Sequence, residues 1–145
     1  MTEYAEGTIA RRLVRVYEAL TADGEAALPL LRELYHEQVQ FEDPIQSVVG
    51  IEPFIEANGR LVRRAKSLTF NFGTIVEQDG HLFAVWTMTF QPRMGPALVF
   101  EGATHATFRD GLIVYQRDYW DLLSSTADSI PGMGMVYRRL VGLIA

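Results

Sequence analysis

The chain has 145 residues, a formal net charge of −5, 48% hydrophobic residues and 21% charged residues. This composition predicts one globular domain over residues 1–145 and excludes a disordered or fibrous chain. Cysteine is absent, which excludes disulfides, thiolate metal ligands and thiol catalysis. The acidic balance with a single lysine argues against a nucleic-acid partner, and an acidic start without a long apolar stretch predicts a cytoplasmic protein with no membrane span.

The first half of the chain predicts three helices and one short strand. Apolar residues recur at helical spacing over residues 9–22, and Asp23-Gly24 ends that helix. A second helix is predicted from Pro29 to residue 35, followed by a short strand over residues 39–42. Asp43-Pro44 ends the strand, a loop runs to residue 50, and Pro53 opens a third helix.

After residue 67 the hydrophobic period changes from helical to alternating. Four strands are predicted over residues 68–77, 81–91, 97–109 and 112–121. Asp79-Gly80 and Asp110-Gly111 favour tight hairpins, so neighbouring strands should pair antiparallel. A last apolar run over residues 133–145 has helical character, and it either packs on a sheet or a partner subunit or closes a pocket mouth.

This order of elements predicts an α+β fold. Three N-terminal helices should cover the concave face of a curved, cone-shaped, mostly antiparallel sheet, with a short C-terminal helix at the end. The gap between helices and sheet at the wide end is where a ligand pocket is expected.

Two segments carry a family resemblance, Phe41-Glu42-Asp43-Pro44 and Arg117-Asp118-Tyr119-Trp120-Asp121. With the order of elements, they resemble the nuclear transport factor two-like superfamily, and within it the SnoaL-like branch of ketosteroid isomerases, polyketide cyclases and limonene epoxide hydrolases. The resemblance implies a pocket for an apolar small molecule. It also implies that Asp43 matches the isomerase base and Asp118 the hydrolase base.

Other positions match these relatives less well. The isomerase tyrosine falls near Val16 or Tyr17, and the protonated isomerase aspartate falls near Thr104. The hydrolase arginine and second aspartate fall near Trp86 and Met88.

Alternation along the last strand places Asp118 on one face with Gln116 and Trp120. Burial there would raise the pKa of Asp118 toward the range useful for acid–base catalysis, and a second carboxylate, Asp43, would push the two pKa values apart. The alternatives are a structural Asp118 bonded to backbone or Arg117, and an Asp43 that only caps a turn.

The expected pocket wall includes Trp86, Met88 and Thr104, together with Tyr17. An aromatic stripe of this kind is also typical of an ordinary core. The three histidines lack the spacing of a metal site, so no metal is expected. No phosphate-binding glycine loop or nucleophile turn is present, so no cofactor and no serine acyl chemistry are expected.

Two functions remain open: an acid–base enzyme of isomerase, cyclase or epoxide-hydrolase type, and a non-catalytic ligand-binding or interaction module. A homodimer through the outer sheet face is also expected, because that face carries apolar residues. They are Val85, Val99, Ile113, Tyr115 and Tyr119.

Overall fold

The computed structural model describes residues 8–127 and 130–144, so the acidic start of the chain lies outside the described residues. The first element is α1 (Ile9–Asp23), which begins after Thr8, whose hydroxyl accepts a hydrogen bond from the Arg11 N–H at 3.2 Å. Its apolar stripe, which includes the buried Leu13 and Tyr17, packs toward the sheet. The first predicted helix is therefore confirmed.

The second helical segment differs from the prediction. A 3₁₀ helix, η1 (Gly24–Leu30), precedes a single α-helical turn, α2 (Leu31–Leu34). Pro29 lies inside the 3₁₀ segment, where its missing N–H removes an α-helical hydrogen bond. Tyr35 already belongs to the next strand, so the helical segment begins and ends earlier than the sequence indicated.

The short strand predicted over residues 39–42 is longer, because β1 spans Tyr35–Glu42. The predicted loop after Asp43 contains a further strand, β2 (Ser47–Val49), which pairs antiparallel with β1. Helix α3 (Ile51–Arg64) follows Gly50 (φ 97°) and begins two residues earlier than predicted, so Pro53 lies within its first turn.

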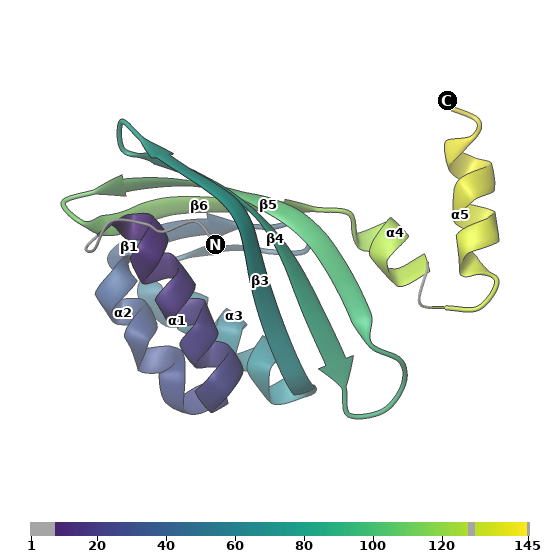
Figure 1. Ribbon diagram of the computed structural model, residues 1–145, viewed down its shortest axis with the longest axis horizontal. Coiled ribbons are helices and arrows are strands. Elements are labelled where there is room, and N and C mark those ends of the chain that lie inside the picture. Colours follow the sequence, from purple (N-terminus) through teal and green to yellow (C-terminus); the bar gives the residue numbers. More distant parts are fainter. Residues whose placement is uncertain (1–7, 128–129, 145) are drawn as a thin grey trace.

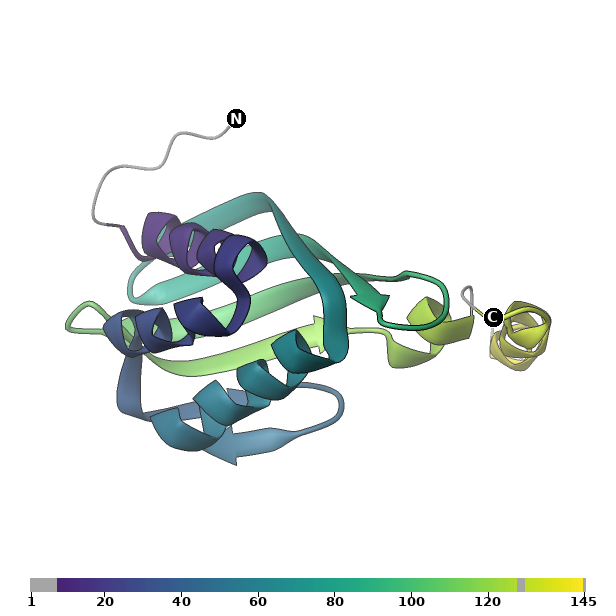
Figure 2. The ribbon, with the colours of Figure 1, turned by 90° about the horizontal axis from the view of Figure 1, so that it is seen from below.

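Four long strands follow as predicted: β3 (Ala65–Gln78), β4 (His81–Pro92), β5 (Leu98–Arg109) and β6 (Leu112–Trp120). Both Asp-Gly pairs have positive φ at both residues, which confirms the tight hairpins. The sheet order is β2-β1-β6-β5-β4-β3, in which only the β1–β6 pairing is parallel among the described residues. Figures 1 and 2 show the helices lying across the concave face, as expected for the α+β class.

A register shift in the β5–β6 pairing corrects one prediction. Thr107 pairs with Tyr115 and Phe108 with Ile113, so one residue of β6 is unpaired between them. An extra residue reverses which face the side chains occupy. Ile113, predicted on the outer face, is therefore fully buried in the core.

After β6 the chain forms α4 (Leu122–Ala127), which the sequence did not predict, and α5 (Met133–Val141), the predicted C-terminal helix. The main contact of α5 is with α4, and Figure 2 shows α5 projecting away from the sheet and the N-terminal helices. The Tyr137 hydroxyl donates to Asp121 Oδ2 at 2.8 Å. No helix within the described ranges is long and hydrophobic enough to cross a bilayer.

Candidate functional site

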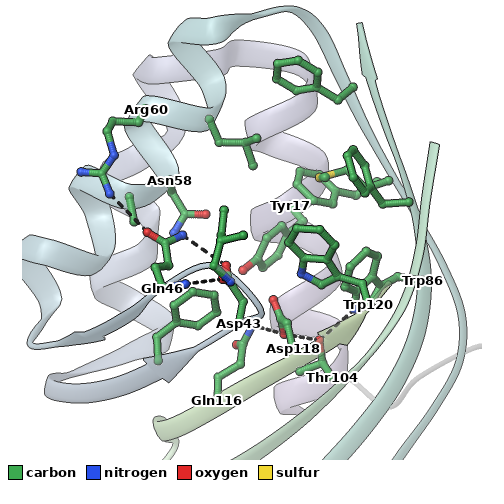
Figure 3. Close-up of a pocket in the computed structure, with 18 of the residues that line it drawn as sticks. Tyr17, Asp43, Gln46, Asn58, Arg60, Trp86, Thr104, Gln116, Asp118 and Trp120 are labelled. Carbon is green, nitrogen blue, oxygen red and sulfur yellow. Dashed lines mark hydrogen bonds between the residues drawn. The ribbon is translucent and has the colours of Figure 1, made fainter. Parts of the chain in front are cut away.

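A cavity of about 390 Å³ lies between the helices and the concave sheet (Figure 3). Its wall is mostly apolar. The apolar lining residues are Leu13, Phe41, Ile45, Phe54, Ala57, Leu61, Phe70, Phe72, Phe90, Leu98, Phe100 and Leu122. All eight residues singled out from the sequence also line it, namely Tyr17, Asp43, Trp86, Met88, Thr104, Gln116, Asp118 and Trp120.

Strand register brings the polar residues of the sheet together. Thr104 on β5 lies opposite Asp118 on β6, and Gly102 lies opposite Trp86 on one side and Trp120 on the other. A β-carbon added at Gly102 would stand 2.5 Å from the Trp86 ring and 2.9 Å from the Tyr119 carbonyl oxygen. Glycine at this position therefore lets the Trp86 indole lie against the sheet.

One oxygen of Asp118 is fixed by two donors. Asp118 Oδ1 accepts a hydrogen bond from the Thr104 hydroxyl at 2.6 Å and another from Gln116 Nε2 at 3.0 Å. Among the described residues Oδ2 has no hydrogen-bond partner, and no side-chain oxygen or nitrogen fully buried there is left unsatisfied. Oδ2 therefore opens onto the cavity (Figure 3).

The two donors to Asp118 are themselves held in place. The Trp86 indole N–H donates to Thr104 Oγ1 at 2.9 Å, and the Tyr35 hydroxyl donates to Gln116 Oε1 at 2.7 Å. Because Tyr35 has one hydroxyl proton, its 3.2 Å contact with the Tyr17 hydroxyl requires Tyr17 to donate. The Tyr17 hydroxyl proton is therefore used in this hydrogen bond, and Tyr17 contributes its ring to the cavity wall.

Burial controls the protonation of this site. Desolvation, the largest cause, raises the pKa of Asp118 from 3.8 to about 6. The hydrogen bonds from Thr104 and Gln116 lower this pKa by a smaller amount, and repulsion from Asp43 adds a small increase. Desolvation and then the charge of Asp118 raise the pKa of Tyr17 to about 12. At neutral pH Asp118 is mainly a carboxylate and Tyr17 a neutral phenol.

Asp43 shares the cavity but its oxygens are occupied by its own turn. Oδ1 accepts from the backbone N–H groups of Ile45 and Gln46 at 2.8 and 2.9 Å, and Oδ2 accepts from Gln46 Nε2 at 3.1 Å. This arrangement stabilises the turn between β1 and β2. The carboxylate that faces the cavity with an open oxygen is Asp118.

The sequence did not single out several polar residues of this site. Tyr35 is buried behind Gln116, and Asn58 and Gln46 line the cavity. The Asn58 amide nitrogen donates to the Phe54 carbonyl oxygen at 3.0 Å, which leaves its oxygen toward the cavity (Figure 3). Arg60 and Arg64 also line it, although the sequence indicated only a solvated basic face. Their position on the edge of an amphipathic helix was the one available signal.

A second hollow shares Asp43, Gln46, Asp118, Trp120 and Leu122 with the first cavity. Its additional lining is more polar and includes Glu42 and Arg117. Asp118 therefore lines both an apolar cavity and a more polar hollow. Within residues 8–127 and 130–144 no three His, Asp or Glu side chains gather as a metal site.

Comparison with known families adds to this geometry. Residues 13–116 match the family model of the SnoaL-like domain, which is most of the chain. The chain belongs to the SnoaL-like domain family. No curated protein matches the sequence.

Solved structures of low sequence identity share the fold. A protein described as a SnoaL-like polyketide cyclase from Jannaschia sp. CCS1 is 17% identical with a TM-score of 0.73, over 89% of this chain and 97% of that one. An LEH-like epoxide hydrolase from M. tuberculosis is 14% identical with a TM-score of 0.70, over 94% of each chain. A protein with a ketosteroid isomerase-like fold from Catenulispora acidiphila DSM 44928 is 18% identical with a TM-score of 0.72, over 84% of this chain and 94% of that one.

Proposed function

We propose that this SnoaL-like protein is an acid–base enzyme in which Asp118 removes a proton from an apolar substrate held in the cavity. The observation that carries the proposal is the asymmetry of Asp118. One oxygen is fixed by Thr104 and Gln116, while the other opens onto an apolar cavity. Its pKa of about 6 makes it a stronger base than an exposed carboxylate and leaves it ionised at neutral pH.

The chemistry that fits best is enolisation. Asp118 Oδ2 takes a proton from a carbon next to a carbonyl group, and the electrons of the broken C–H bond move onto the carbonyl oxygen as an enolate. Protonated Asp118 then returns the proton to another carbon, which is an isomerisation. In a cyclisation the enolate carbon attacks a second carbonyl of the same substrate, and Asp118 returns the proton to the new alkoxide.

The donors of the site favour a substrate that stabilises its own enolate. The hydroxyl protons of Tyr17 and Thr104 and the indole proton of Trp86 are engaged within the network, so none is free to bind an enolate oxygen. A second carbonyl conjugated with the enolate would supply that stabilisation. Epoxide opening fits less well, because it needs a proton donor and Asp43 is occupied as a hydrogen-bond acceptor.

The test is proton exchange in D₂O with a panel of apolar 1,3-dicarbonyl compounds, enolisable ketones and epoxides of polyketide or terpenoid size, followed by NMR. Asp118→Asn should slow exchange or turnover by about two to four orders of magnitude, because the amide keeps the shape and loses the base. Asp43→Asn is the matched control in the same cavity and should have a much smaller effect. Full activity in Asp118→Asn would reject the assignment.

A non-catalytic binding module on the same fold is the second candidate. It is favoured by one observation, the occupied oxygens of Asp43, which leave Asp118 without a second catalytic carboxylate. Tight binding of panel members without any exchange or turnover would support it.

We also infer that two copies of the chain associate through the outer face of the sheet. This face carries exposed apolar side chains on neighbouring strands, which are Phe83 and Val85 on β4, Val99 on β5 and Tyr119 on β6. Exposed patches of this kind are typical of protein interfaces.

A further inference from the structure

Two arginines of α3 stand at the rim of the cavity that holds Asp118. Arg60 and Arg64 are four residues apart, so they lie one helical turn apart on the same side of α3, and both line the cavity. Arg63 is directed elsewhere. Its guanidinium forms ion pairs with Glu56 at 2.7 Å and Glu25 at 3.5 Å, and it does not line the cavity.

Few described residues offset the positive charges of the two rim arginines. Arg60 Nη2 donates to Gln46 Oε1 at 3.2 Å, and its Nη1 lies 3.9 Å from Glu56, a carboxylate that already pairs with Arg63. The Arg64 side chain makes no hydrogen bond or ion pair with the part of the chain that the structure describes. A guanidinium offers five N–H donors, so most of those at this rim are open.

The remaining wall separates these cations from the base. Figure 3 shows Arg60 and Asn58 on the α3 side of the cavity and Asp118 with Thr104 on the sheet side. The wall also includes apolar side chains of the sheet such as Phe70, Met88 and Phe100. A molecule that fills the space therefore meets a carboxylate at one wall, apolar groups along its body and cations at the mouth.

We propose that the cavity selects amphipathic organic anions, with an apolar body along the sheet and a carboxylate bound by Arg60 and Arg64. Guanidinium groups match the planar, two-oxygen geometry of a carboxylate, and a pair one turn apart can hold both oxygens. The inference rests on the proposed function, because it concerns the same cavity and names the class of its substrate. The anionic group would lie at the mouth, and the carbon that loses its proton would lie near Asp118.

The experiment compares two probes of equal apolar body, 4-cyclohexylbutanoate and 4-cyclohexylbutan-1-ol. Neither absorbs where tryptophan does, and both tryptophans of the chain, Trp86 and Trp120, line the cavity, so quenching or enhancement of their fluorescence reports binding. The acid should bind about 10- to 100-fold more tightly than the alcohol at pH 7.5, as expected for charge-assisted hydrogen bonds.

The double variant Arg60→Gln/Arg64→Gln should reduce the affinity for the acid to that for the alcohol and leave alcohol binding unchanged, which also reports an intact fold. Arg63→Gln is the matched control on the same helix and should leave both affinities unchanged. Equal binding of acid and alcohol by the natural protein, no binding of the acid at millimolar concentration, or a preference for the acid that survives the double variant would each overturn the inference.

The same titration with Asp118→Asn separates this inference from the proposed function. The preference for the acid should persist there, because the arginines are intact. If the preference is absent while Asp118→Asn abolishes proton exchange, only the anion selectivity is wrong. If the preference is present while Asp118→Asn keeps full activity, only the catalytic assignment is wrong.

Discussion

Asp118 is placed where an ionised carboxylate is unfavourable for the fold. Its pKa in the folded protein is about 6, above the ordinary value of 3.8, because burial penalises the charged form. The folded state therefore binds this proton more tightly than the unfolded state. The penalty is absent below pH 3.8, grows between pH 3.8 and 6, and stays constant above pH 6.

Asp118→Asn should consequently stabilise the protein at neutral pH. The asparagine oxygen can accept the same hydrogen bonds from Thr104 and Gln116 without carrying a charge. The free energy of unfolding should rise by up to about 3 kcal/mol at pH 7.5, and the gain should disappear near pH 4. Urea unfolding of both proteins at the two pH values measures this. A variant less stable than the natural protein at pH 7.5 would contradict the prediction.

Tyr35 is a positioning residue for Asp118 through Gln116. Its hydroxyl holds Gln116 Oε1, so the amide N–H₂ group faces the carboxylate. In Tyr35→Phe the amide is free to rotate and remove that donor, which should raise the pKa of Asp118 further. NMR titration of the Asp118 carboxyl carbon measures the shift. Tyr17→Phe, one step further along the network, should have a smaller effect, and an unchanged midpoint in Tyr35→Phe would refute the positioning role.

At the scale of the elements, the packing of the Trp86 indole of β4 over β5 depends on the absence of a side chain at Gly102. Gly102→Ala would place a methyl group 2.5 Å from the Trp86 ring, which would move the indole into the cavity and weaken its bond to Thr104. A destabilisation of about 1–3 kcal/mol is expected from overpacking, together with weaker binding of a cavity ligand.

Gly73→Ala is the control for this substitution. Its added carbon would stand 3.0 Å from a methyl group of Val85. That contact is on the outer face of the sheet, so the control should alter stability without altering ligand affinity. Equal loss of ligand binding in both variants would show that the effect of Gly102→Ala is not local.

The elements that the sequence predicted well are those set by local signals. Alternating residues and the Asp-Gly turns located β3 to β6. The same alternation placed Trp86 on the inner face with other large side chains, and it placed Asp118, which the family resemblance had pointed out, among apolar groups. Strand β2 and the shift that buries Ile113 involve neighbours in sequence, but three residues are too few to show alternation, and a bulge is not visible in the alternating pattern. The parallel β1–β6 pairing depends on partners distant in sequence. For the same reason Tyr35 was not identified, because its role is fixed by Gln116 on another strand.

At the scale of the whole molecule, the outer sheet face predicts the oligomeric state. Val85, Val99 and Tyr119 are each about half exposed, at 49%, 48% and 50%. Burying such a face between two copies should be favourable because it removes apolar surface from water. Sedimentation at micromolar concentration should therefore give about twice the single-chain mass of 16.3 kDa.

Substitutions on that face test whether it forms the contact. Val85→Glu combined with Val99→Glu should shift the protein to a monomer, because two buried charges would face the partner without counter-ions. Met94→Glu, at a residue 89% exposed in the loop between β4 and β5, is the control and should leave the mass unchanged. A natural protein that sediments with the mass of one chain would exclude the dimer.

The parallel pairing of β1 with β6 determines when the cavity forms during folding. The hairpins from β3 to β6 join neighbours in sequence, whereas β1 can pair only with β6, the last strand of the sheet in the sequence, to complete this part of the sheet. Contacts between distant segments bear a large loop-closure entropy and are formed slowly. Because Phe41 of β1 and Asp118 of β6 line the same cavity, a chain that has completed its meander still has an open site. Ligand binding in refolding experiments would accordingly report the final closure of the sheet rather than the collapse of the hairpins.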